Sequence, residues 1–181
     1  VEYSEFLKPS IEKYIANREM DFEKVKEMDP EKLKQLIEEF LSQENEFKDI
    51  QDTKDLGMLQ LILDKVKQKL IPSPQTCLRK LKKILPEMAF ELGKTLTESL
   101  LECNRNLKGI PKTVEDFVWH VRCIRDAENK MEDITNRVSE LKDLMQLMDS
   151  YSFKYPEPTQ RKYKETLTQL DNLRTKMQNF Y

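Results

Sequence analysis

The sequence predicts an all-α protein: an elongated bundle of long antiparallel helices that could form two sub-bundles, with no sheet of consequence. Apolar residues recur at spacings of three and four along most of the chain, which is typical of amphipathic helices. Glycine occurs only three times in 181 residues, so few breaks interrupt these patterns. Charged residues make up 35% and hydrophobic residues 38%, a balance that favours helices with solvated faces and a narrow apolar stripe.

The longest predicted helix follows Gly109 and Pro111. Thr113 and Asp116 have the spacing of a capping box, with Asp in place of the usual Glu or Gln. A single apolar stripe then continues through Val114, Phe117, Val121, Ile124, Met131, Ile134, Val138, Leu141, Met145 and Met148. A continuous helix to about residue 151 would be on the order of 55 Å long.

Two helices are expected near the start of the chain. Pro9 could open the first helix, leaving residues 1–8 as the remnant of a preceding one. Asp29 as N-cap and Pro30 at the first helical position begin the second, which ends near residue 49. So tight a connection predicts an antiparallel hairpin of helices.

Residues 56–63 are too apolar to lie on a surface, and both a short buried strand and a buried helical turn fit them. Their continuation through Val66 and Leu70 at helical spacing favours the helix. Residues 71–74 (IPSP) predict a rigid connector, because each proline favours an extended conformation in the residue before it.

Residues 74–108 predict a further helix, and its apolar stripe keeps its phase through Pro86. Pro86 either kinks this helix or divides it, and the unbroken phase favours a kink. Gly109 provides the C-cap. After a turn at residues 152–158, a last helix carries Tyr163, Leu167, Leu170, Leu173, Met177 and Phe180. A soft domain boundary near Gly109 therefore separates residues 1–108 from residues 109–181.

The sequence gives no sign of an enzyme, a cofactor or a metal site. The glycines at 57, 93 and 109 can form neither G-x-x-x-x-G-K-[ST] nor G-x-G-x-x-G, which excludes a Gly-rich nucleotide loop. His120 is the only histidine, so the chain has neither a catalytic triad nor a two-histidine metal site. We expect His120 to be an ordinary helix residue.

Charge, hydropathy and cysteine usage argue against a nucleic-acid-binding, a membrane-spanning and a disulfide-rich protein. A net charge of −2 gives no nucleic-acid footprint, and neither a membrane-spanning run nor a signal peptide is present. Cys77, Cys103 and Cys123 are scattered and odd in number, which argues against a disulfide framework and favours a reducing compartment. The chain begins at Val1 and stops within a helical pattern, so we expect it to be a piece of a longer protein.

Two features could contact a partner. Arg79, Lys80, Lys82 and Lys83 form a basic cluster, which could dock an acidic partner or a membrane surface or simply be a solvated face. Trp119 points away from the apolar stripe of its helix, towards a second packed helix or a partner.

Three segments resemble the stem of axonemal dynein heavy chains. Residues 109–118 (GIPKTVEDFV) resemble the family's p-x-T-v-e-d-F-v stretch, and residues 56–57 with 70–74 resemble its l-G-x-f…L-i-P-x-P stretch. Residues 151–174 are similar to a third stretch, matching at Pro156, Tyr163, Leu167, Leu173 and Arg174, whereas Leu170 stands where Trp is common. The resemblance covers about residues 51–181.

This resemblance implies a non-enzymatic helical strut of the stem, just N-terminal to the linker, that connects the motor to its cargo or axonemal anchor. Its partners would be the linker and upstream stem of the heavy chain, with accessory chains or a neighbouring heavy chain as further candidates. It would lie in the cytoplasm, at the ciliary axoneme, without nucleic acid or membrane. The alternatives are a spectrin-like scaffold or tether and, less favoured, a peripheral membrane module that uses the basic cluster.

Overall fold

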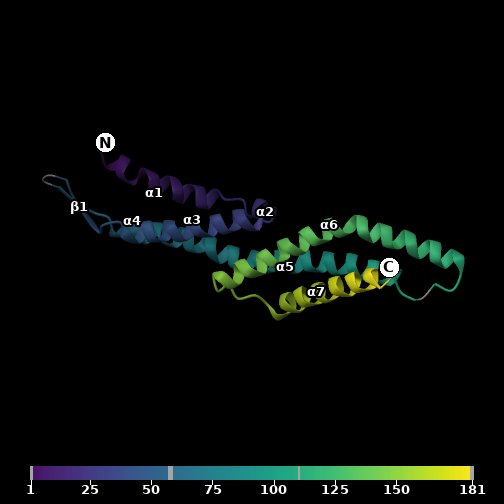
Figure 1. The fold of residues 1–181 in the computed structure, drawn as a ribbon. Helices are drawn as coiled ribbons and strands as arrows, with labels where there is room; N and C mark the ends of the chain where they lie inside the picture. Colours follow the sequence, from purple (N-terminus) through teal and green to yellow (C-terminus); the bar gives the residue numbers. More distant parts are fainter. Residues whose placement is uncertain (1, 57–58, 110, 180–181) are drawn as a thin grey trace. The chain divides into compact units, whose positions relative to one another are not determined.

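The computed structural model describes residues 2–56, 59–109 and 111–179, and it is all-α as predicted, with one short β-hairpin. Its elements are α1 (Glu2–Glu19), α2 (Phe22–Val25), α3 (Pro30–Asp49), β1 (Thr53–Leu56), β2 (Leu59–Ile62), α4 (Asp64–Leu70), α5 (Pro72–Asn106), α6 (Val114–Ser150) and α7 (Glu157–Gln178) (Figure 1). They form two compact units, residues 1–84 and 85–181.

The two units divide within α5, between Ile84 and Leu85, whereas the sequence analysis marked a boundary near Gly109. Gly109 lies inside the second unit, in the turn between α5 and α6. A helix breaker ends a helix whether or not a domain ends there, because the next helix can fold back onto the previous one. The assignment of residues 1–108 and 109–181 to separate parts of a stem stays a prediction.

In the first unit, α1 and α3 are antiparallel as predicted, but the first helix ends at Glu19 and α2 lies between the two. The Asn17 side chain donates to Gln43 at 2.8 Å, and Lys13 forms an ion pair with Glu46. Pro9 lies inside α1, so the expectation that it opens the helix was wrong. A proline removes one bond of the helical ladder, and the bonds on either side continue this helix.

The preference for helix at residues 56–63 was also wrong. Strands β1 and β2 pair antiparallel, from Thr53 opposite Ile62 to Leu56 opposite Leu59. Ile62 is 68% exposed, so its part of the run does lie on a surface. A run this short contains too few residues to show a period, and the pairing across the hairpin decides its conformation. Residues 57–58 lie outside the described residues.

Helix α5 begins at Pro72, so the predicted connector at residues 71–74 was wrong. Pro72 and Pro74 occupy the first turn, where backbone N–H groups need no partner within the helix. Pro86 lies inside the helix, which is continuous and not divided there. Gly109 follows the helix end with a φ of +93°, a conformation that glycine adopts without strain.

In the second unit, α5 from Leu85 onward packs with α6 and α7. Helices α5 and α7 are parallel, because the contacts between them advance in the same direction along both. Helix α6 runs antiparallel to both (Figure 1). All three helices meet at Gly93: a Cβ there would lie 3.1 Å from Lys162 Cγ and 3.6 Å from Leu141 Cδ2. The core of the second unit includes Leu85, Ala89, Leu96, Leu100, Ile124, Ile134, Val138, Leu141, Leu144, Met148, Leu170 and Leu173.

Helix α6 begins with the predicted capping box. The Asp116 amide donates to Thr113 Oγ1 at 3.1 Å, and the Thr113 amide donates to Asp116 Oδ2 at 3.2 Å. Hydrogen bonds from Thr113 and from the Lys112 amide lower the pKa of the Asp116 carboxyl. The helix is continuous to Ser150, as its spacing predicted.

The predicted apolar stripe of α6 is wrong at its beginning. Val114 is 76% exposed and Phe117 is 51% exposed, whereas the stripe is buried at Ile124 and again at Ile134 and Val138. The reason is length: α6 has 37 residues and α7 has 22, so the N-terminal part of α6 extends past the ends of α5 and α7 (Figure 1). Periodicity defines an apolar face, but only a neighbouring helix covers it.

We therefore predict that Phe117→Ala lowers the free energy of unfolding by less than about 2 kcal/mol, because half of the ring is already in water. The matched control is Leu141→Ala in the same helix, which should cost about 2–5 kcal/mol because Leu141 is fully buried. Urea titrations followed by circular dichroism measure both. Equal losses would contradict the placement of Phe117.

Candidate functional site

The candidate functional features of the described residues are surface and polar features rather than a metal centre. No group of three or more His, Cys, Asp or Glu side chains among them could hold a metal ion. Within the same residues, no helix has the length and apolar character needed to cross a membrane. The candidate functional features are therefore the basic cluster, the exposed aromatic of α6 and a buried polar network between helices.

The basic cluster lies on α5 in the first unit, and all four of its side chains are exposed. Lys80 Nζ lies 4.6 Å from the centre of the Phe22 ring, a cation–π contact with α2. The pKa of the Glu44 carboxyl is lowered, mainly by hydrogen bonds from Lys48 and then from Gln75. The positive charge of Lys82 lowers it further. Half of the cluster thus interacts with its own unit.

The other half is available for a partner. Within the described ranges, neither the Arg79 side chain nor the Lys83 side chain forms an ion pair or a hydrogen bond. Both guanidinium and ammonium groups can bind carboxylates of an acidic surface.

Lys80 also borders a cavity of about 380 Å³, together with Arg18 and Lys69. These cations come from α1, α4 and α5, so sequence reasoning could not group them. Arg18 lies 5.9 Å from the ring centre of Tyr14, another residue of the cavity wall. The cavity can attract anionic groups, but its one thiol is a poor nucleophile, because burial raises the pKa of Cys77.

Trp119 is half exposed on α6, in the second unit. Its ring lies edge-on against the ring of His120, with centroids 5.9 Å apart and planes inclined by 75°. His120 is buried, as a packed helix residue is. Trp119 and the basic cluster belong to different compact units, so the predicted contact residues do not form one site within either unit.

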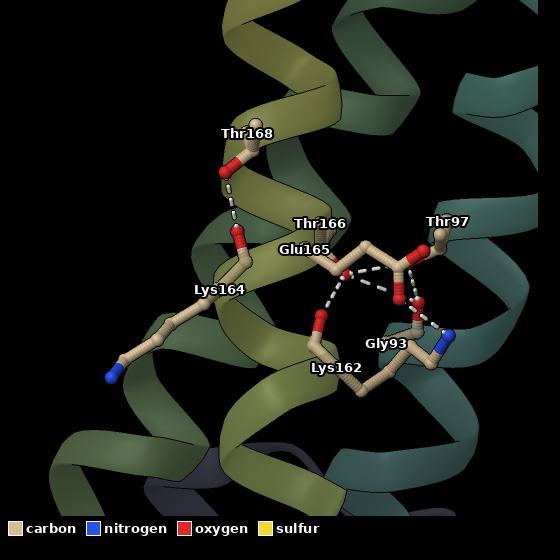
Figure 2. Close-up of polar contacts among 7 residues, drawn as sticks. All are labelled: Gly93, Thr97, Lys162, Lys164, Glu165, Thr166 and Thr168. Carbon is tan, nitrogen blue, oxygen red and sulfur yellow. Dashed lines mark hydrogen bonds and ion pairs between the residues drawn. The ribbon is translucent and has the colours of Figure 1, made fainter.

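A buried polar network joins α5 to α7, and sequence reasoning missed it (Figure 2). The Thr97 hydroxyl donates to the Gly93 carbonyl at 2.7 Å, and the two hydroxyl oxygens of Thr97 and Thr166 lie 2.9 Å apart. Thr166 has a single hydroxyl proton, which it can donate either to the Thr97 hydroxyl oxygen or to the Lys162 carbonyl at 2.8 Å. The sequence does contain one signal for this network. Thr166 precedes the core residue Leu170 by one turn, so its spacing places it on the buried face of the helix.

A second polar contact lies further along the same pair of helices. The Asn104 side chain donates to the backbone carbonyl of Gln169 at 3.0 Å and to its side chain at 3.1 Å. Lys176 donates to the Asn104 carbonyl at 2.8 Å, and burial lowers the pKa of this lysine. Because these bonds have fixed partners, α7 cannot slide along α5 without breaking them.

We predict that Thr166→Val lowers the free energy of unfolding by about 1–2 kcal/mol, because it removes hydrogen bonds while keeping the side-chain volume. Thr168→Val is the matched control: Thr168 is exposed on the same helix and donates to the Lys164 carbonyl at 3.0 Å. It should change stability by less than about 0.5 kcal/mol.

A double-mutant cycle with Thr97→Val should show that the two hydroxyls are coupled. Chemical denaturation gives all four free energies. Additive losses would show that the contact between Thr97 and Thr166 contributes nothing.

The contact of Lys80 predicts a difference within the basic cluster. Lys80→Glu should cost about 0.5–1 kcal/mol, because it replaces a cation over the Phe22 ring with an anion. Lys83→Glu should stay within about 0.5 kcal/mol of the original chain. Thermal melts of both variants test this, and a Lys83 loss as large as the Lys80 loss would contradict it.

Comparison with known proteins gives an informative similarity. No family model matches the chain. It is similar to dynein axonemal heavy chain 6 of Homo sapiens, with 21% identity over 120 residues, or 66% of this chain. The match covers only 3% of that much longer protein. The similarity suggests a distant relation to dynein heavy chains without locating the chain in a particular region of them.

Proposed function

We propose that the chain is a non-enzymatic structural module of a dynein heavy chain stem: a helical strut between the linker and the cargo-binding or axonemal anchor. The observation that carries this proposal is the similarity to dynein axonemal heavy chain 6 over 120 residues. The resemblance of residues 109–118 and 151–174 to stem sequences supports a position just before the linker.

The second unit has the physical properties that such a strut needs. Helix α6 spans 37 residues and begins with a complete capping box, which satisfies backbone donors at its free end. Force along the bundle would load its helices in shear. The polar contacts at Thr97 and Thr166, and at Asn104 and Gln169, oppose sliding of α7 against α5.

The partners of this strut are the linker and the upstream stem of the same heavy chain, with accessory chains or a neighbouring heavy chain as further candidates. Arg79 and Lys83 offer positive charge to an acidic surface on one of them. The proposal places the chain in the cytoplasm, on the ciliary axoneme, where it acts in microtubule-based motility.

Binding to a purified linker tests this function. The immobilised chain should retain the linker region of dynein axonemal heavy chain 6, because the proposal makes a dynein linker its direct neighbour. An immobilised spectrin repeat of similar length is the control for nonspecific helix association. Retention no better than by the spectrin repeat would contradict the stem proposal.

A further inference from the structure

A row of apolar side chains lies exposed at the N-terminal end of α6. Val114, Val118 and Val121 follow one another at spacings of four and three, so they line one side of the helix, with Phe117 beside them. Val114, Phe117 and Val118 are 76%, 51% and 46% exposed, and Val121 is half-buried. Contiguous apolar surface of this kind is typical of a binding face.

The charges beside this row have a specific arrangement. Glu115 and Arg122 are seven residues apart, or about two turns, so they lie on the same edge of the row, one near each end. Both are exposed. Within residues 2–56, 59–109 and 111–179, neither side chain forms an ion pair or a hydrogen bond. The row therefore has a negative end and a positive end.

We propose that this face binds a second copy of the chain, with the two α6 helices antiparallel and a two-fold axis near Val118. In such a pair, each residue faces the one at the same distance on the other side of the axis. With the axis between Val118 and Trp119, Glu115 of each copy lies opposite Arg122 of the other, and the apolar rows of the two copies face each other. The face is self-complementary in charge as well as in apolar surface.

Parallel pairing does not have this property, because it places the charged edges of the two copies on opposite sides of the interface. The patch is also small: stable interfaces bury about 1,600 Å² in total, and four side chains per copy supply clearly less. The pairing is therefore weak, and the charged edge determines its orientation more than its strength. It does not depend on the stem proposal.

Analytical ultracentrifugation of the 181-residue chain over a wide concentration range tests this pairing. The chain should dimerise reversibly. Glu115→Arg alone, or Arg122→Glu alone, should weaken the dimer by about tenfold, because each places like charges opposite one another at two symmetric positions. Glu132→Arg is the matched control, since it changes an exposed charge on α6 outside the paired segment and should leave association unchanged.

Two combinations make the test specific. The double variant Glu115→Arg/Arg122→Glu should recover the original affinity. A mixture of the two single variants should form heterodimers in preference to either homodimer, because it pairs Arg with Glu at both edges. This recovery also shows that the single variants are folded. The proposal is overturned if the chain stays monomeric, or if the single charge reversals leave the dimer unchanged. It is also overturned if the double variant or the mixture does not restore association.

Discussion

Burial of one face of α6 against α5 and α7 is the constraint on which the second unit depends. Leu141 and Met148 of α6 are fully buried, and Leu141 approaches Gly93 of α5 where α7 also contacts it. Apolar burial is strong but has no direction, so by itself it would allow the helices to slide. The Thr97–Thr166 contact fixes the axial position of α7 along α5, because the two hydroxyls meet at one register only.

The same unit explains why one end of α6 differs from the rest. Where α5 and α7 are present, the apolar stripe of α6 becomes core; beyond their ends it becomes surface. Val114 and the half-exposed ring of Phe117 therefore lie on the surface of the unit, whereas Leu141 contributes to its core.

Much of the fold could be predicted because its signals are local. The capping box at Thr113, the Asp29–Pro30 restart and the glycine at 109 each act through groups a few residues away. The prediction failed at Pro9, where the helical bonds on either side continue α1, and at residues 59–62, where pairing with β1 decides the conformation. Of the candidate contacts, exposure of the basic cluster agrees with the sequence, but the cavity beside Lys80 unites separate helices and left no pattern in the sequence.

The sequence alone determined that the chain is helical and where α3 and α6 begin, because backbone hydrogen bonding and capping act over one or two turns. Only the tertiary structure decided which apolar residues are covered. It also decided that Thr97 and Thr166 meet, and that Glu115 and Arg122 flank an exposed row. The reason is that burial depends on the lengths and positions of neighbouring helices, which no single segment encodes.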